Sequence, residues 1–403
     1  MKDFFKIFKD KKNPVISVVL CVVIFAGVIF GVIFSNVYEK KQASVTASLA
    51  SAETLAKGYF YDEALKVLET SNYPEDTKIL EAKQAIEQQK ASLVPYEGKF
   101  YHVFFHSLIV YPELAFDGEY THEGYDMWMT TVSEFKAMLP QLYERGYVLY
   151  PLKEYKKDQP IMLPEGKKPL VISIDDVNYY DYMETDGFAD RLLVDEEGNI
   201  VCEVKTPDGN VEKSYEGDVM PILDNFVKEH PDFSYKGTKG IVAVTGYEGV
   251  FGYNFIKAEG KEKETLIAEA KKVAQALKNT GWQIACHSYT HNDYFKDGGV
   301  SMSELTYDTN RFKERIYDVV LQPDIYISPF GYHLREGDER LQYLKDMGYS
   351  TYCPVSSSGR TFFTEEGVLI QDRFNLDRYN MRNQKDFINE TFFNVDDVYY
   401  NEQ

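Results

Sequence analysis

The sequence is poor in cysteine, histidine and tryptophan, and it has no excess of positive charge. Its 403 residues include four Cys, seven His and two Trp, and 64 acidic against 44 basic side chains give a net charge of −20. Four cysteines in so long a chain cannot form the disulfide framework of a small secreted domain. The acidic balance argues for no nucleic acid partner, because nucleic acid binding requires basic patches that displace counterions.

Charge is also missing from one long apolar run, VISVVLCVVIFAGVIFGVIF, which covers residues 15–34. As a helix rising about 1.5 Å per residue, this run can cross the roughly 30 Å hydrocarbon core of a membrane. A cleaved signal peptide is the alternative, but its apolar region covers about 7–15 residues and ends at a small-residue cleavage site. We therefore expect a cytoplasmic tail over residues 1–14 and a transmembrane helix over residues 15–35.

Lysines flank this run unequally. Five lysines precede it, and two follow it, at Lys40 and Lys41. Positively charged flanks stay on the cytoplasmic side of a membrane. We expect a single-pass protein of the cytoplasmic membrane, with its N-terminus inside and everything after about residue 36 outside.

Residues 42–93 are rich in good helix formers, and Gly58 and Pro74 divide them into segments. We expect a short all-α stalk there. Part of the stalk weakly resembles a tetratricopeptide unit, but a single such repeat cannot bury a core by itself. The stalk is therefore either a spacer or a module that binds a protein partner, and the next domain is expected over residues 100–403.

From about residue 100, short apolar runs alternate with amphipathic stretches. Strand–helix alternation with one crossover per strand indicates an α/β fold, a parallel sheet or barrel wrapped by helices. One insertion, at residues 190–217, has β-type runs separated by EEGN and PDGN turns and predicts a small hairpin on the rim. In such barrels the chemistry lies at the carboxyl ends of the strands.

Two acids, Asp175 and Asp176, directly follow the apolar strand PLVISI. Just beyond a strand end, both carboxylates can point into one cleft and have separate tasks. The alternative interpretation is a polar loop start, where Asp is common.

Two histidines, His287 and His291, follow the strand WQIAC. Their i, i+4 spacing would place both imidazoles on one helical face, within reach of one ion, although such a pair can be incidental. An Asp and two His give three protein ligands and leave positions open for water and substrate, as in hydrolytic metal sites. A third strand, IYI, runs into a turn at residues 328–331.

Together these three strand ends resemble the polysaccharide deacetylase family, the NodB-homology domain of carbohydrate esterase family 4, over about residues 100–375. SIDDV is similar to its T-F-D-D-G motif, HSYTH matches H-S/T-x-x-H, and ISPFG matches R-x-P-x-G apart from the Arg. FFHSLI and ERGYVLYPL resemble the branch that acts on poly-N-acetylglucosamine. The departures are Val177 in place of the motif's Gly, the missing Arg, and the lack of a late Leu-x-His.

The resemblance implies a distorted (β/α) barrel of the NodB type and a divalent metal ion, with zinc the expected one. Asp176, His287 and His291 would hold the ion. Asp175 would then be the general base, which takes the proton of the attacking water. The backbone N–H of Phe330 would help to hold the tetrahedral oxyanion.

The resemblance also implies roles around the turn at residues 328–331. Pro329 and Gly331 would shape the substrate site, and His333 would begin a loop on its rim. Arg373, in LIQDRFN, would replace the missing Arg that orients Asp175 in many family members.

The general acid is the least defined part of the site, because no His follows His333. His102, His106 and His333 are the candidates, with water or a carboxylic acid such as Asp293 as alternatives. His106 occupies the position of the Tyr-His start of the poly-N-acetylglucosamine branch, inside an apolar strand run. A buried imidazole there needs a partner, either a backbone carbonyl or the reacting groups. We expect His106 to be the acid.

The sequence thus predicts a membrane-anchored, extracytoplasmic, metal-dependent deacetylase that removes N-acetyl groups from a cell-surface or cell-wall polysaccharide. Two alternatives remain. One is a degenerate, non-catalytic sugar-binding domain of the same fold, and the other is a scaffold protein that works through its helical stalk. The sequence leaves the polymer, and the choice between N-acetyl and O-acetyl groups, open.

Overall fold

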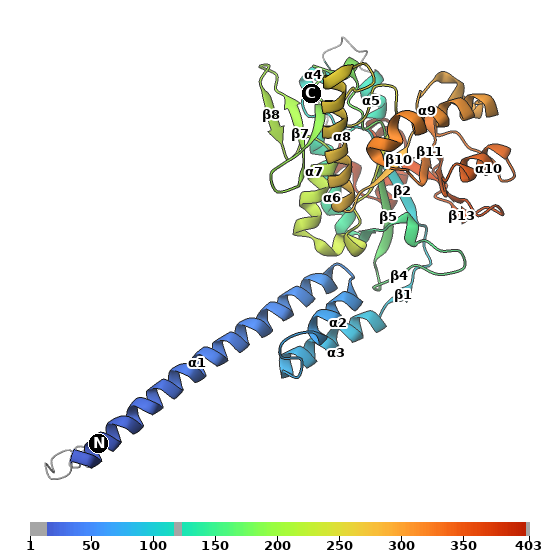
Figure 1. Cartoon of the computed structure of the whole chain (residues 1–403). Helices are drawn as coiled ribbons and strands as arrows, with labels where there is room; N and C mark the ends of the chain where they lie inside the picture. The colour runs from blue at the N-terminus through green and yellow to red at the C-terminus, as the bar shows by residue number, and fades with distance from the viewer. Residues whose placement is uncertain (1–13, 117–122, 400–403) are drawn as a thin grey trace. The chain divides into compact units, whose positions relative to one another are not determined.

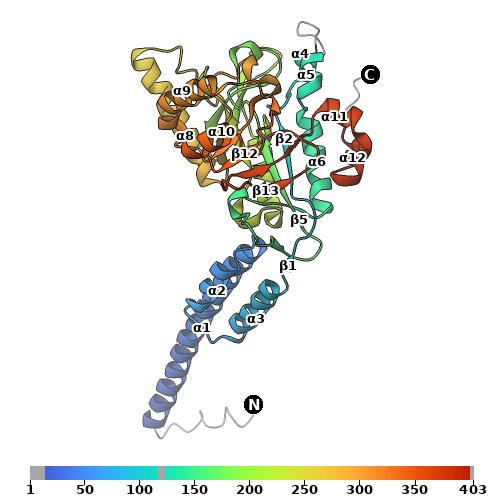
Figure 2. The same cartoon turned by 90° about the vertical axis from the view of Figure 1, so that its right-hand side faces the viewer.

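The computed structural model describes residues 14–116 and 123–399. The chain forms two compact units, Met1–Ser92 and Leu93–Gln403. Figures 1 and 2 show an all-helical first unit and a second unit built around a curled sheet.

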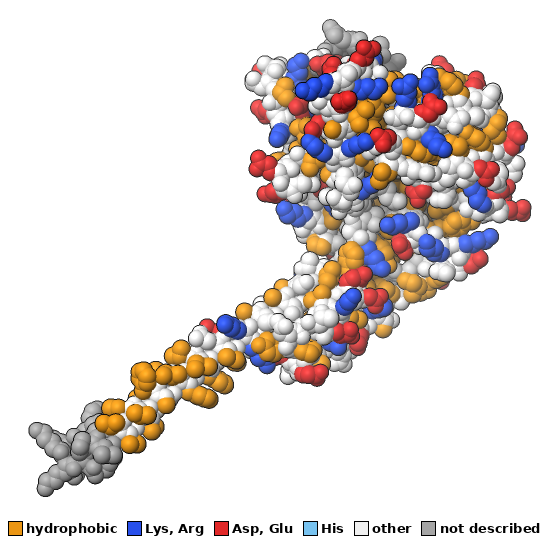
Figure 3. All heavy atoms as spheres, viewed as in Figure 1, with side chains coloured by type: hydrophobic (Ala, Val, Ile, Leu, Met, Phe, Trp, Pro, Cys, Tyr) orange, Lys and Arg blue, Asp and Glu red, His pale blue; other side chains and the backbone are white. Residues whose placement is uncertain are grey.

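The first unit consists of α1 (Pro14–Lys57), α2 (Tyr61–Glu69) and α3 (Thr77–Ala91). Val45, Ala52 and Leu68 are buried where α2 and α3 pack against the second half of α1. The first half of α1 carries the apolar run, whose described side chains are exposed except for the half-buried Leu20 (Figure 3). Its length and composition make α1 a candidate membrane helix.

Six parallel strands in the order β2-β5-β9-β10-β11-β12 form the main part of the sheet in the second unit, and β3 adds to β5. The bounds are β2 Tyr101–Phe105, β3 Tyr147–Leu149, β5 Lys168–Ile174, β9 Ile241–Val244, β10 Gln283–Cys286, β11 Ile325–Ile327 and β12 Thr351–Cys353. These strands lie where the apolar runs of the sequence predict them.

The last strands curl the sheet into a distorted barrel. β14 (Leu369–Gln371) pairs with β12, and β15 (Arg373–Asn375) pairs with β2, so one stretch of chain joins both edges. The segment after β12 completes the connection, since Arg373 N donates to Pro354 O and Ser356 N donates to Arg373 O, both at 2.8 Å. β13 (Thr361–Phe363) lies antiparallel on β14 outside this ring. The predicted α/β fold with a distorted barrel is confirmed.

Alternate residues of the strands pack into two separate clusters. On β9, Val242 and Val244 join the large cluster beneath the helices, whereas Ile241 and Ala243 join a smaller one with Ala285. This two-residue period buries both faces of the sheet, as a parallel sheet requires. Polar residues on the inner face are therefore directed into the barrel, where the site is formed.

Helices cover the outside of the curled sheet. α8 packs on α9, and Arg145, the residue directly after α6, joins that helix to α12 by a hydrogen bond from its Nη1 to Asn389 O at 2.7 Å. Figure 2 shows α6, α11 and α12 along one side. The bounds are α4 Pro112–Ala115, α5 Glu123–Trp128, α6 Val132–Glu144, α7 Val219–Glu229, α8 Gly260–Asn279, α9 Met302–Val320, α10 Glu339–Asp346, α11 Arg378–Asn383 and α12 Lys385–Thr391.

The insertion is larger than the expected hairpin. It is an antiparallel sheet of β6 (Ala189–Val194), β7 (Ile200–Lys205) and β8 (Val211–Ser214). Each of its two tight turns places a glycine at positive φ, +87° at Gly198 and +86° at Gly209. Two such turns separate three β-type runs, so the prediction of a hairpin was one strand short. A further short antiparallel pair joins β1 (Val94–Pro95), at the start of the unit, to β4 (Met162–Leu163).

Candidate active site

The ends of β5 and β10 bring one carboxylate and two imidazoles together. Asp176 follows β5, and His287 and His291 follow β10. One ligand atom from each lies within 4.8 Å of the other two. His287 is buried, whereas Asp176 and His291 are half-buried. This spacing allows all three groups to bind one ion.

The two histidines are close for a different reason from the one that their spacing suggested. Residues 287–292 form a loop, not a helix, so the prediction of one helical face was wrong. Ser288 and His291 have φ values of +68° and +47°, in the left-handed region that interrupts a right-handed helix. The hydroxyl of Ser288 accepts a hydrogen bond from His291 N at 2.9 Å. The two ring centroids are 5.0 Å apart.

A buried carboxylate on α9 holds this loop. Asp308 accepts hydrogen bonds from Tyr289 N at 2.7 Å, from Thr290 N at 2.8 Å and from the Thr290 hydroxyl at 2.7 Å. Its side chain is fully buried, and these donors compensate for its desolvation. The loop that carries His291 is therefore fixed from behind.

His287 is oriented as a neutral ligand. Its Nδ1 lies 3.0 Å from Ile327 O, and because a carbonyl can only accept, Nδ1 carries the proton and Nε2 has a free lone pair. Burial lowers the pKa of His287, although the charges of Asp175 and Asp176 oppose this. A backbone acceptor behind a ligand imidazole is the usual way to fix its tautomer and ring orientation.

Asp176 is ionised and lies in a strained backbone position. Burial raises its pKa, but electrostatic interactions with His291, His287 and His106, with a hydrogen bond from Tyr180, outweigh this and lower the pKa to about 2. Its φ is +58°, a conformation that non-glycine residues adopt at a cost of order 1–3 kcal/mol. Strain of this kind is concentrated at functional sites.

Val177, which departs from the family motif, does not take up a left-handed conformation. It is buried and donates its N–H to Ala243 O at 3.1 Å. The left-handed residues around it are Asp176 and Tyr179. The turn after the two acids therefore differs from one that depends on a glycine, as the sequence predicted.

Asp175 pairs with an arginine from the strand that curls the sheet. Arg373 Nη1 lies 2.7 Å from Asp175 Oδ1 and 2.9 Å from Oδ2. Both residues are at most 2% exposed, and the guanidinium lies 4.2 Å from the centre of the Phe104 ring. Asp175 Oδ2 is also 3.8 Å from His287 Nε2. The arginine thus holds this carboxylate beside the imidazole.

His102 lies behind this pair, inside the barrel. Its Nε2 is 2.8 Å from the Ser173 hydroxyl, which is 3.4 Å from Arg373 Nη1. Burial, and then the charge of Arg373, lower the pKa of His102 well below its usual value. A neutral imidazole at this depth is a structural partner of the arginine.

His106 lies just beyond the end of β2. The strand ends at Phe105, so the expectation of a histidine inside the strand was wrong. His106 is half-buried, and its Nδ1 donates to Trp128 O at 2.9 Å, which leaves Nε2 free. An electrostatic interaction with His106 is among the causes that lower the pKa of Asp176, so His106 lies near the Asp–His–His group.

The turn after β11 reaches the site through Phe330. Phe330 is 44% exposed, and its ring lies 4.4 Å from the His291 ring, centroid to centroid. Gly331 has φ +68°, and a Cβ there would lie 2.5 Å from Val355 Cβ, so a larger residue does not fit. Pro329 is buried. His333 is exposed and donates from Nε2 to Val355 O at 2.8 Å, and the described contacts do not join it to the Asp–His–His group.

Two residues of this site were missed from the sequence, Asp308 and Tyr180. Asp308 lies on the apolar face of α9 with Leu305 and Phe312, at helical spacing. An acid on an apolar face is a signal that could have been read. Tyr180 gave no such signal, because tyrosines are abundant in this chain.

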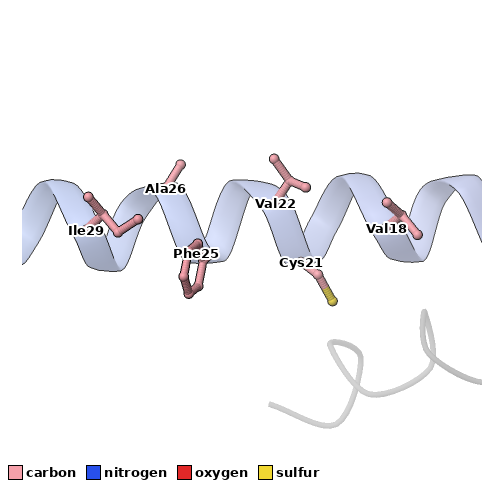
Figure 4. A pocket seen from close by; sticks show the side chains of 6 residues that line it. All are labelled: Val18, Cys21, Val22, Phe25, Ala26 and Ile29. Atoms are coloured by element: carbon pink, nitrogen blue, oxygen red, sulfur yellow. The ribbon is translucent and has the colours of Figure 1, made fainter.

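A separate hollow on α1 has no relation to this chemistry. It is lined by side chains of the apolar run, all from one helix (Figure 4): Val18, Cys21, Val22, Phe25, Ala26 and Ile29. Five of these six side chains are apolar, and the thiol of Cys21 is the only group among them that could bind an ion or release a proton.

In this curled α/β sheet an Asp and two His lie together at the ends of β5 and β10, the strands on either side of β9, and form a candidate metal-binding group. The sequence model of the family described as polysaccharide deacetylase matches residues 254–352. This stretch contains both histidines and the turn with Phe330. Residues 254–352 therefore match the polysaccharide deacetylase family, and the resemblance seen in the motifs of the sequence is confirmed.

Among the solved structures that are similar to this chain are three deacetylases. The Streptococcus pyogenes deacetylase PplD in complex with acetate has 14% identity and a TM-score of 0.41, covering 72% of this chain and 95% of its own. IcaB from Ammonifex degensii has 13% identity and a TM-score of 0.40, and the match covers 73% of this chain and 99% of IcaB. The deacetylase domain of BpsB from Bordetella bronchiseptica has 10% identity and a TM-score of 0.35, and the match covers 70% of this chain and 98% of that domain. No curated protein sequence matches this chain.

Proposed function

We propose that this protein is a membrane-anchored, metal-dependent deacetylase that removes N-acetyl groups from a cell-surface or cell-wall polysaccharide on the outer side of the cytoplasmic membrane. The observation that carries the proposal is the group of Asp176, His287 and His291 within 4.8 Å of one another, directly beside the paired Asp175 and Arg373. A binding domain or a scaffold has no use for both features together.

The residues present fit a divalent metal ion, with zinc as the best match. One carboxylate and two imidazoles are a usual zinc ligand set, and His287 already has its Nε2 lone pair free. Bound there, the ion would polarise the acetyl carbonyl and promote the ionisation of a water molecule.

Asp175 is the general base of the proposed reaction. Its Oδ2 lies on the side of His287 Nε2, so it can accept the proton of the attacking water next to the ligand group. Arg373 holds this carboxylate in place through Nη1. The pair takes over the task of the arginine that is missing from the turn at residues 328–331.

His106 and Phe330 are the remaining residues of the proposed catalytic site. With Nδ1 bonded to Trp128 O, His106 is oriented to donate a proton from Nε2 to the leaving amine. The backbone N–H of Phe330 serves the oxyanion that forms when water attacks the amide. Pro329 and Gly331 give that turn its shape.

Exposed aromatic rings beside the site support a carbohydrate substrate. Trp128 is 54% exposed and carries the carbonyl that holds His106, and Phe330 is 44% exposed beside His291. Flat rings of this kind bury the apolar faces of sugar rings efficiently. We assign His333, on the exposed loop after Phe330, to the rim of the proposed substrate site. Together with the sequence motifs, this favours poly-N-acetylglucosamine or a related acetylated glycan.

The membrane anchor is α1, with the N-terminus in the cytoplasm. The excess of lysines before the apolar run supports this orientation. Protease added to intact cells, after any wall is removed, should cut within residues 42–98. Full protection of this segment would place the domain in the cytoplasm and would contradict the proposal of a cell-surface or cell-wall substrate. The helices α2 and α3 are the part of the chain available to a protein partner.

The direct test is acetate release by the full chain in detergent micelles, from a panel of N-acetylated and O-acetylated glycans. We expect release from an N-acetylated glycan, loss of release with a chelator and recovery with Zn²⁺. The Asp175→Asn variant is the control for contaminating activity. Binding of the glycan without release of acetate would contradict the proposal and favour a sugar-binding domain.

A further inference from the structure

A buried tyrosine hydroxyl lies against the carboxylate of Asp176. The Tyr180 hydroxyl is 2.7 Å from Asp176 Oδ1 and 2.8 Å from the Thr245 hydroxyl. Tyr180 is 5% exposed and Thr245 is fully buried. The hydroxyl therefore joins the end of β9 to the candidate ligand at the end of β5.

The chemistry of these groups sets the direction of both hydrogen bonds. An ionised carboxylate can only accept, so the single proton of Tyr180 is donated to Asp176 Oδ1. The oxygen of Tyr180 must then accept the proton of the Thr245 hydroxyl. Both protons point toward Asp176, which strengthens the bond to a charged acceptor.

The conformation of the local backbone brings the Tyr180 side chain back to Asp176, four positions earlier in the chain. Asp176 and Tyr179 have φ values of +58° and +53°, and Asn178 N donates to Asp176 O at 2.6 Å. Asn178 also fixes Thr245, since its Oδ1 accepts from Thr245 N at 2.9 Å and its Nδ2 donates to Thr245 O at 3.1 Å. The loop and the second partner of Tyr180 are thus held by one asparagine.

The ring of Tyr180 is held as firmly as its hydroxyl. It stacks on Tyr182, with centroids 5.6 Å apart and an interplanar angle of 14°, and on Tyr247, with values of 5.1 Å and 13°. Two nearly parallel neighbours leave the ring little freedom to turn. The hydroxyl is therefore preorganised toward Asp176.

We propose that Tyr180 is the positioning residue of the metal centre: it occupies Oδ1 of Asp176, so that Oδ2 is the oxygen offered to the ion beside His287 and His291. This inference rests on the proposed metal site. Asp176 would then bind through one oxygen, in an orientation fixed before the ion arrives. Partners of this kind behind ligand groups typically change metal affinity by about 10–100-fold when they are removed.

The test is the Tyr180→Phe variant, which keeps the ring and its stacking and removes the hydroxyl. Zn²⁺ is titrated into the full chain in detergent micelles, against a competing coloured chelator. We expect the dissociation constant for Zn²⁺ to rise by about 10–100-fold. At saturating Zn²⁺, kcat should return toward the wild-type value, a rescue that general damage to the fold would not give.

Tyr143→Phe is a matched control. The Tyr143 hydroxyl also donates to a carboxylate, Asp232, at 3.0 Å, but on α6 and away from the site. Its loss should leave the affinity for Zn²⁺ unchanged. A rise equal to that of Tyr180→Phe would show a general effect of losing such a bond, and would overturn the proposal.

Thr245→Val is the second variant, because it keeps Tyr180 and removes the proton donor behind it. We expect a rise in the dissociation constant that is smaller than that of Tyr180→Phe. Should Tyr180→Phe not fold, an unchanged affinity in Thr245→Val overturns the proposal. Wild-type affinity in Tyr180→Phe also overturns it and leaves the metal site intact, whereas a wild-type chain that binds no Zn²⁺ removes the proposed function itself.

Discussion

Two neighbouring carboxylates at the end of β5 have opposite surroundings. Asp175 faces the barrel interior and lies against a guanidinium, 2.7 Å from Arg373 Nη1. Asp176 turns into the left-handed region and lies among imidazoles and a phenol. Two residues of the same type, one position apart, therefore have surroundings that suit the two roles proposed for them, proton exchange for Asp175 and metal binding for Asp176.

Loss of a ligand on the Asp176 side should have the largest effect. His291→Ala removes one of three groups that lie within 4.8 Å of one another, and two remaining ligands hold zinc poorly. We expect the metal content and acetate release to fall together to background, measured by elemental analysis and an acetate assay on the same sample. A variant that binds one equivalent of zinc and stays active would remove His291 from the ligand set.

Loss of the proposed acid should slow the reaction while leaving the metal in place. His106→Ala should lower turnover by about 10²–10⁴-fold, the usual contribution of general acid–base catalysis, and remove the alkaline limb of the pH–rate profile. His333→Ala is the control, because its Nε2 is bonded to Val355 O on the exposed loop. Wild-type profiles for both variants would mean that neither histidine is the acid.

Breaking the pair on the Asp175 side should cost stability. Arg373→Met leaves a buried carboxylate without its partner, which typically costs about 3–5 kcal/mol. Urea unfolding of the full chain in micelles measures this loss. Adding Asp175→Asn to the same chain should recover part of it, because the uncompensated charge is then gone. A double variant less stable than Arg373→Met alone would argue against a direct pair.

The smallest expected effect is a pH dependence from His102, behind Arg373. Its pKa in the folded chain is well below the usual 6.5, so between these two values the unfolded chain binds more protons. The contribution of His102 to the free energy of unfolding should therefore be fully present above about pH 6.5. It should fall as the pH is lowered, by up to about 1.4 kcal/mol per pH unit. His102→Gln should reduce this slope in urea unfolding at pH 7.5, 6.5 and 5.5, and an unchanged slope would contradict a neutral, buried His102.

The parts of the fold that depend on local patterns could be predicted from the sequence. The apolar runs gave β5, β9 and β10, the amphipathic stretches gave α6 and α9, and the strand ends placed Asp176 and His287 at one edge. Parallel strands that end in polar residues carry this information in short stretches of sequence.

The parts that depend on long-range packing could not be predicted in the same way. Residues 354–375 curl the sheet through pairing between strands that are distant in the sequence. The prediction of one helical face for His287 and His291 failed because Ser288 has a left-handed backbone conformation. The motif resemblance pointed to Arg373, but its contact with Asp175 joins positions 198 residues apart. The bond from Tyr180 to Asp176 depends on two left-handed residues that no composition or periodicity predicts.

The division of labour between the two carboxylates is tested most directly by measuring zinc content and acetate turnover in Asp175→Asn and Asp176→Asn side by side. The account predicts one equivalent of zinc but turnover lowered by about 10²–10⁴-fold in Asp175→Asn, and loss of both zinc and turnover in Asp176→Asn. Equal zinc loss in the two variants, or full turnover in Asp175→Asn, would contradict it.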